Sequence, residues 1–222
     1  DLEQATGACF DEEKLAASLA VYNEHNQVMR QLAALLAGHP EISAAQRSDI
    51  YKSAWFMAKE EHTALVRSLL DALSAQAPGQ AKLRIFTSGI LADAPDLTAI
   101  LDDCGLQVVG DDVATESRQY RTDAPDEGTP LERLGKKYCA MDHCSVLYDV
   151  EKKRVGYIVD QAKALQAQGV LLILTKFCDP EEFDVPLIRR ACQQAGLPCA
   201  LIEVDRQMVN YEQARTAIET FR

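Results

Sequence analysis

The stretch from Gly169 to Thr175 constrains the fold of this chain more than any other segment. It reads Gly-Val-Leu-Leu-Ile-Leu-Thr, so almost every side chain in it is apolar. A short apolar run without alternating polar residues is typical of a strand buried on both faces of a parallel sheet. Parallel strands need long crossover connections, which are usually helical. We therefore expect an α/β fold.

Three further segments predict strands of the same sheet, at residues 83–88, 107–111 and 199–204. Helical patterns follow them, near residues 96–104, 131–138, 152–168, 182–195 and 211–221. Strands that alternate with helices imply right-handed crossovers and a sheet covered on both faces. The sequence thus predicts a four-stranded parallel, flavodoxin-like sheet with helices on both faces.

The first third of the chain predicts helices rather than strands. Apolar residues at helical spacing, a capping-box pattern and a second amphipathic run predict helices from Asp11, from Ser43 and over Lys59–Ser74. The Pro-Gly stretch at 75–81 interrupts this pattern and reads as a linker. We expect a helical interdomain segment over residues 1–78 and an α/β domain over residues 79–222.

Composition restricts the class of protein. The 222 residues carry a net charge of −11, which disfavours binding to nucleic acid or to an anionic membrane surface. No apolar run approaches the ~20 residues of a membrane span. Seven cysteines, an odd number without a secretion signal, indicate reduced thiols in the cytoplasm. Because the first residue is Asp1 rather than Met, we expect a processed or trimmed piece of a longer chain.

The carboxyl ends of parallel strands lie at one edge of the sheet, where α/β proteins bind ligands. Residues of several chemical types follow or end the four predicted strands: Ser88, Gly89, Asp112, Lys176, Cys178 and Glu203. The solvation of loops is enough to explain why carboxylates occur at these strand ends. It explains Cys178 less well, because a structural cysteine more often lies within a strand or on a helix face. Cys178 is therefore the leading candidate for chemistry.

Two uses of the Cys178 thiol are open. It is a candidate nucleophile with His143, the one histidine of the predicted α/β part, or a metal ligand of the kind that holds iron–sulfur clusters. Cys139 and Cys144 have four residues between them, a weak metal-binding pattern, and a zinc site that adds His143 is weaker still. The other cysteines of the α/β part are expected to be structural: Cys104, Cys192 and Cys199.

Arg118 and Arg121 bring positive charge close to a strand end in an acidic chain. Such arginines suit bidentate recognition of a phosphate or carboxylate. The alternative is ion pairing within the chain to one of three nearby carboxylates: Glu116, Asp123 or Asp126.

Two other groups predict structural roles. The charged run Glu151–Arg154 reads as a solvated helix start, and Trp55 and Phe56 read as core or interdomain packing.

Several motifs occur in an order that resembles the 2-hydroxyacyl-CoA dehydratase family, also described as the benzoyl-CoA reductase/2-hydroxyglutaryl-CoA dehydratase D-component family. The resemblance covers essentially the whole chain. Its most specific parts are Lys-Phe-Cys-Asp-Pro at 176–180 and Glu-Ser-Arg-Gln-Tyr-Arg at 116–121. The supporting motifs are Ile85–Leu91, Val109–Val113 and Ile202–Asp205.

The resemblance implies a heterodimeric iron–sulfur lyase. An ATP-dependent activator protein supplies one electron, and an (R)-2-hydroxyacyl-CoA loses water through a ketyl radical to give an enoyl-CoA. Three cysteines of each subunit hold a [4Fe–4S] cluster, and the last of them matches Cys178. The other two belong to an N-terminal α/β domain that this chain lacks, so the fragment alone is expected to be inactive.

The resemblance favours a smaller, β-type subunit paired with a homologous partner. The strand-end residues and the arginines considered above are the candidates for contact with the substrate or for support of the cluster ligand: Ser88, Gly89, Asp112, Arg118, Arg121, Lys176 and Glu203. Three alternatives stay open: a benzoyl-CoA reductase-type subunit, a non-catalytic module that binds a CoA ester or a partner, and a thiol-dependent hydrolase using Cys178 and His143.

Overall fold

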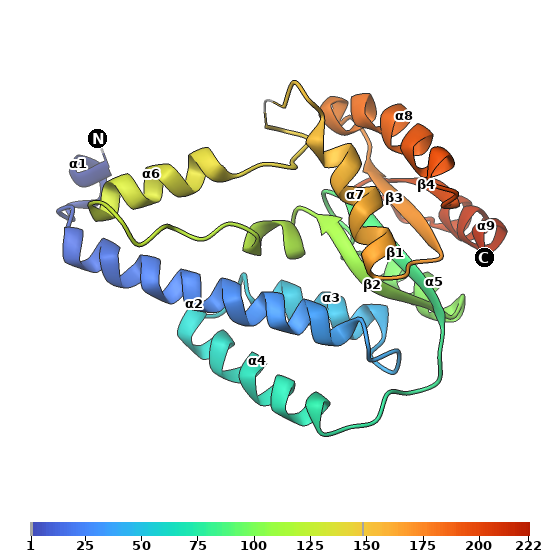
Figure 1. Ribbon diagram of the computed structural model, residues 1–222, viewed down its shortest axis with the longest axis horizontal. Coiled ribbons are helices and arrows are strands. Elements are labelled where there is room, and N and C mark those ends of the chain that lie inside the picture. Colours follow the sequence, from blue (N-terminus) through green and yellow to red (C-terminus); the bar gives the residue numbers. More distant parts are fainter. Residues whose placement is uncertain (1, 148) are drawn as a thin grey trace.

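The computed structural model describes residues 2–147 and 149–222 and contains the expected parallel sheet (Figure 1). In the described residues its strands are β1 (Leu83–Gly89), β2 (Leu106–Val113), β3 (Gly169–Thr175) and β4 (Cys199–Val204). Their spatial order is β2-β1-β3-β4, and every pairing is parallel. The predicted fold class is confirmed.

Strand β3 is buried on both faces, which explains its unbroken apolar sequence. Leu171 and Ile173 point into one core cluster, and Val170 and Leu172 point into another. Three of these side chains are fully buried, and Leu172 is nearly so. Side chains of a strand alternate between faces, so a strand between two cores needs an apolar residue at each position.

Each face of the sheet is covered by a pair of helices. Leu97 of α5 (Pro95–Asp103) and Ile218 of α9 (Glu212–Phe221) belong to the first core. Ile158 of α7 (Lys153–Ala164) and Ile188 of α8 (Asp179–Gln194) belong to the second. Figure 1 shows α7 and α8 side by side against the strands, as the contacts between them require.

The N-terminal third forms the expected helices α2 (Glu12–Leu36), α3 (Ala44–Ser53) and α4 (Lys59–Ser74). Asp11 caps α2 by accepting a hydrogen bond from the Lys14 N–H, and Ser43 forms the predicted capping box of α3 with Gln46. A third core joins α2 and α4, and Tyr120 of the short 3₁₀ helix η1 (Ser117–Tyr120) completes it. The proposed division into segments 1–78 and 79–222 stays a prediction.

Other elements differ from the sequence-based expectation. A short helix α1 (Leu2–Thr6) was not anticipated, α6 spans Pro130–Ala140, and α7 ends four residues before the expected 168. Helix α8 begins at Asp179 rather than near residue 182, because Pro180 suits the first turn of a helix, where no backbone N–H is required. This earlier start makes Cys178 the N-cap residue.

Among the described residues, no helix is both long enough and apolar enough to span a membrane.

Candidate functional site at the carboxyl edge of the sheet

The predicted site residues fall into a buried and an exposed group at the carboxyl edge, where the strands end. Ser88 and Asp112 pair in register across β1 and β2, and the Ser88 hydroxyl donates to Asp112 Oδ2 over 3.1 Å. Both side chains are buried. Lys176 after β3 and Glu203 within β4 are exposed. The edge therefore has an ordered polar interior beneath solvent-facing charges.

Gly89 is required by strand packing. A Cβ atom at this position would lie 2.3 Å from the carbonyl oxygen of Ile173 on the neighbouring strand β3. No real Cβ tolerates such an approach to backbone. The absence of a side chain thus lets β1 and β3 meet closely at the site.

Three arginines, Arg118, Arg121 and Arg154, surround the carboxylate of Asp112; we call these four residues the arginine cluster. Arg154 Nε donates over 2.7 Å and Arg118 Nη2 over 3.1 Å to Asp112 Oδ2, and Arg121 Nη1 donates over 2.8 Å to Oδ1. Burial alone would raise the pKa of Asp112, but the charges of Arg154, Arg118 and Arg121 hold it below its ordinary value. Asp112 is therefore an ionised anchor.

Arg154 connects this anchor to the helix that carries Cys178. Its guanidinium lies 2.8 Å from Glu181 Oε1 and 3.2 Å from Asp184 Oδ2, both on α8. Ser145 donates a further hydrogen bond to Glu181 over 2.7 Å. The prediction of a solvated helix start was wrong for Arg154, which is 3% exposed. The arginine cluster fixes the first turns of α8 against the ends of β1 and β2.

The donors of Arg118 and Arg121 are used mainly inside the chain. Arg118 Nη2 donates to the carbonyl oxygens of Gly89 and Asp112 over 3.1 and 2.6 Å. Arg121 lies 4.2 Å over the ring of Tyr157. Ion pairing was thus the better alternative, but with a different acid. The three carboxylates first considered pair elsewhere: Glu116 with Arg47, Asp123 with Arg30 and Asp126 with Arg133.

Cys178 presents its sulfur at the start of α8. Its backbone N–H donates to the carbonyl oxygen of Thr175 over 3.1 Å, and its thiol makes no capping hydrogen bond. The partial positive charge of a helix N-terminus stabilises an anionic sulfur ligand. Beside it, Phe177 adopts a left-handed φ of 66° and is 88% exposed. Cys178 itself is half-buried.

The other thiols do not assemble into a metal site. Within the described residues, no group of three or more His, Cys, Asp or Glu side chains could hold a metal ion. Cys139 is exposed on α6, Cys144 Sγ lies 3.5 Å from Arg118 Nη1, and His143 pairs with Asp142. Cys104 and Cys192 are buried, as expected of structural cysteines, and Cys199 is half-buried. In the described part of the chain, Cys178 therefore does not belong to a grouped set of metal-ligating side chains.

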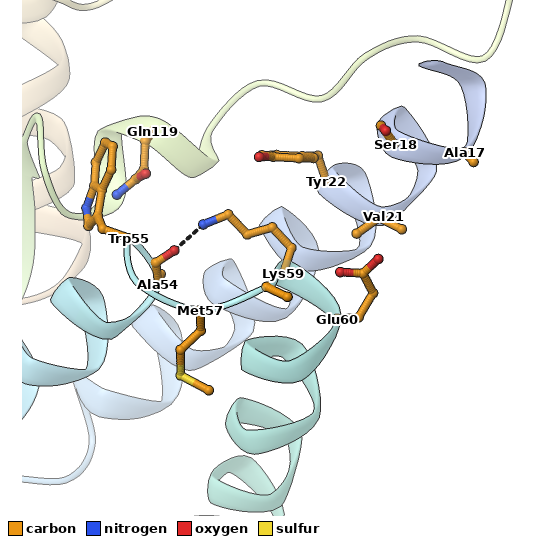
Figure 2. Close-up of a pocket in the computed structure, with 11 residues that line it drawn as sticks. Ala17, Ser18, Val21, Tyr22, Ala54, Trp55, Met57, Lys59, Glu60 and Gln119 are labelled. Atoms are coloured by element: carbon orange, nitrogen blue, oxygen red, sulfur yellow. Dashed lines mark hydrogen bonds between the residues drawn. The ribbon is translucent and has the colours of Figure 1, made fainter. Parts of the chain in front are cut away.

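A separate hollow of about 490 Å³ lies between α2 and the α3–α4 connection (Figure 2). Lys59 projects into it and donates to the carbonyl oxygen of Ala54, as the dashed line in Figure 2 shows. Burial lowers the pKa of the Lys59 ammonium, which also lies 5.9 Å from the centre of the Tyr22 ring. This cation therefore has partners within the chain.

Comparison with known proteins decides the family. The family model described as 2-hydroxyglutaryl-CoA dehydratase, D-component, matches residues 1–222. This chain belongs to that family. It is 46% identical over 222 residues to an (R)-phenyllactyl-CoA dehydratase beta subunit of Clostridium sporogenes, covering 99% of this chain and 59% of that protein.

Other relatives are more distant. A lactoyl-CoA dehydratase subunit beta of Anaerotignum propionicum is 35% identical, with 99% of this chain and 60% of that protein covered. A benzoyl-CoA reductase subunit of Thauera aromatica is 23% identical, with 89% and 53% covered. The chain thus spans about 60% of the length of the curated dehydratase relatives it matches.

Proposed function

We propose that this chain is part of a β-type subunit of an (R)-2-hydroxyacyl-CoA dehydratase, a lyase that removes water to give an enoyl-CoA. The names of its more similar relatives, both dehydratase beta subunits, support this proposal. The lower identity to the benzoyl-CoA reductase subunit makes ring reduction the weaker alternative. Because the chain covers only part of each relative, activity is expected of the complete subunit with its partner.

Cys178 would be one ligand of a [4Fe–4S] cluster, which supplies one-electron transfer when bound. The observation that carries this assignment is the uncapped sulfur of Cys178 at the N-terminus of α8. Cysteine thiolates are the ligands that hold such clusters. The remaining ligands would come from outside this chain, since the described residues supply no grouped set.

The surrounding residues would then divide into two roles. Ser88, Asp112 and the three arginines of the arginine cluster orient α8 and thereby Cys178, while Gly89 lets the strands approach. The exposed side chains of Lys176 and Glu203 face solvent at the same edge. They are the candidates for contact with an acyl-CoA substrate or with the partner subunit.

The proposed partners are a homologous dehydratase subunit, an ATP-dependent activator protein and an acyl-CoA substrate. A cytoplasmic location, without nucleic acid or membrane as a partner, completes the proposal.

Anaerobic purification of the full-length subunit with its partner tests this function. We expect iron and sulfide, an EPR signal after one-electron reduction, and formation of an enoyl-CoA from an (R)-2-hydroxyacyl-CoA in the presence of the activator and ATP. A complex that stays free of iron after reconstitution would exclude the dehydratase. If that complex still bound a CoA ester, the non-catalytic module would replace it.

A further inference from the structure

A second cavity, which lies at the carboxyl edge, has the features of a small-molecule site. It has a volume of about 630 Å³ and lies between the end of α3 and the residues that follow β1 and β2. Tyr51, Trp55 and Phe56 provide aromatic walls, and Glu116 contributes a carboxyl group. Cys178 is not among its lining residues, so this cavity differs from the proposed cluster position.

Trp55 and Phe56 were predicted to take part in core or interdomain packing, and their exposure contradicts the first of these alternatives. Trp55 is 58% exposed and Phe56 is 83% exposed, directly after the end of α3. The Trp55 indole N–H donates to the carbonyl oxygen of Thr115 over 3.4 Å, a weak hydrogen bond that orients the ring beside the cavity. Figure 2 shows this indole from the neighbouring hollow. Such clustered exposed apolar surface beside a cavity indicates a binding site.

Glu116 shares Arg47 with another buried carboxylate. Arg47 contacts Glu116 Oε2 through one terminal nitrogen and Asp111 Oδ2 through the other, the latter over 2.5 Å. Asp111 Oδ1 also accepts backbone N–H groups of Val113 and Ser117, both over 3.0 Å. Among the described residues, the Asp111 carboxylate thus accepts hydrogen bonds from three donors, and the Glu116 carboxylate accepts from one. A single proton held by this pair of carboxylates therefore resides on Glu116.

The pKa of Glu116 agrees with this geometry. Burial raises it, and although the charge of Arg47 opposes the rise, the neighbouring charge of Asp111 adds to it. A protonated carboxyl group is a hydrogen-bond donor as well as an acceptor. Glu116 can therefore donate to a ligand in the cavity.

The other polar groups of the cavity carry no net charge. Lys52 and Asp93 form an ion pair of 2.8 Å between Nζ and Oδ2 at its rim. Behind the cavity wall, the positive charge of Arg47 and the negative charge of Asp111 cancel once Glu116 is neutral. The buried hydroxyl of Tyr51 has no hydrogen-bond partner among the described residues. The cavity thus suits an uncharged ligand that accepts a hydrogen bond.

We propose that the cavity between Tyr51, Trp55, Phe56 and Glu116 binds an uncharged carbonyl compound with an aromatic or branched apolar group. The apolar group packs against the aromatic walls, and the carbonyl oxygen accepts a hydrogen bond from the Glu116 carboxyl group. Amides, ketones and thioesters have this chemistry. The site goes beyond the proposed function, since it needs neither a cluster nor an electron.

Four probes with the same phenyl group test the chemistry: 3-phenylpropionamide, propylbenzene, 3-phenylpropionate and 3-phenylpropylamine. Trp55 is the only tryptophan of the chain, so its fluorescence reports binding at this wall. We expect 3-phenylpropionamide to bind about fivefold more tightly than propylbenzene, since one hydrogen bond to a buried donor is worth about 1 kcal/mol. Both charged probes should bind more weakly than the amide.

Variants distinguish binding at a specific site from nonspecific hydrophobic binding. Glu116→Gln keeps an uncharged donor and should retain the preference for the amide, whereas Glu116→Ala should lose it. Phe56→Ala should weaken binding of the amide at least threefold. Phe183→Ala removes a similarly exposed ring from α8, outside the cavity, and should change nothing. Circular dichroism of each variant verifies its fold.

Three results would overturn the proposal. One is an unchanged Trp55 signal up to the solubility limit of the amide. Another is equal affinity for the amide and propylbenzene, together with equal effects of Phe56→Ala and Phe183→Ala on binding of the amide. The third is tightest binding of 3-phenylpropylamine, which would mean that Glu116 is ionised. None of these results depends on iron, so they leave the dehydratase proposal to its own experiment.

Discussion

Arg154 Nε lies 2.7 Å from Asp112 Oδ2 and ties the first turn of α7 to the end of strand β2. The same guanidinium reaches Glu181 and Asp184 on α8. Three elements that are far apart in sequence are therefore joined by one buried cation, immediately beneath the turn that presents Cys178.

Arg154→Ala is expected to destabilise the fold by about 3–5 kcal/mol, because it leaves buried carboxylates without their counter-charge. Urea unfolding of the variant checks this value. Lys153→Ala is the matched control, since its side chain is more than half exposed and pairs with the exposed Glu151. Its effect should stay within about 0.5 kcal/mol. Equal effects of the two substitutions would contradict the structural role of Arg154.

Substitution of two glycines should have opposite consequences. Gly89→Ala would place Cβ 2.3 Å from the Ile173 carbonyl oxygen, so strands β1 and β3 must separate and stability should fall by about 2 kcal/mol or more. Gly135 lies in α6, where a Cβ meets nothing within 4 Å. Gly135→Ala should therefore stabilise by up to about 1 kcal/mol, through helix propensity. Thermal unfolding of both variants compares them directly, and a tolerated Gly89→Ala would refute the close approach.

A buried pair of histidines should make the helical segment sensitive to acid. His25 Nε2 lies 2.9 Å from His62 Nδ1, and His62 Nε2 lies 3.1 Å from the carbonyl oxygen of Ile50. Since a carbonyl only accepts, His62 carries its proton on Nε2 and accepts from His25 at Nδ1. His25 Nδ1 is buried without a partner among the described residues. Both rings are therefore neutral.

Burial, together with repulsion from the Lys59 ammonium and from His62 once it is protonated, lowers the pKa of His25 from 6.5 to about 4. Between these values the unfolded chain binds more protons than the folded one, so stability falls as the pH drops from about 6.5 towards 4. The loss attributable to His25 should reach about 2–3 kcal/mol near pH 4. Urea unfolding at a series of pH values measures it.

His25→Gln removes this titration and should flatten the slope between about pH 6.5 and 4. A His25→Gln variant with an unaltered slope would show that other groups cause the acid sensitivity.

The sequence predicted the elements whose signals are local. The apolar run of β3, the capping box at Ser43 and the helix Lys59–Ser74 all have the predicted positions. Each depends on residues adjacent in the chain or one turn apart. The strand order β2-β1-β3-β4 has no such local signal, because the connection between β2 and β3 is long and contains η1, α6 and α7.

The partners of charged side chains could not be predicted in the same way. Arg154 stands in a run of charges that is typical of a solvated helix start, and only the tertiary fold places Asp112, Glu181 and Asp184 around it. Trp55 and Phe56 are large aromatic residues of the kind that usually pack in a core, yet they lie at a helix end beside a cavity. A buried arginine has no local sequence signal, because its burial depends on carboxylates from other elements.

The iron content of a Cys178→Ala variant tests the central claim most directly. The variant and a Cys139→Ala control, which removes an exposed thiol on α6, should be purified anaerobically as full-length subunits with their partner. We predict that Cys178→Ala loses the EPR signal and most of the iron of this subunit while keeping its fold, and that Cys139→Ala keeps both. Wild-type iron content and an unchanged EPR signal in Cys178→Ala would contradict the assignment of Cys178 as a cluster ligand.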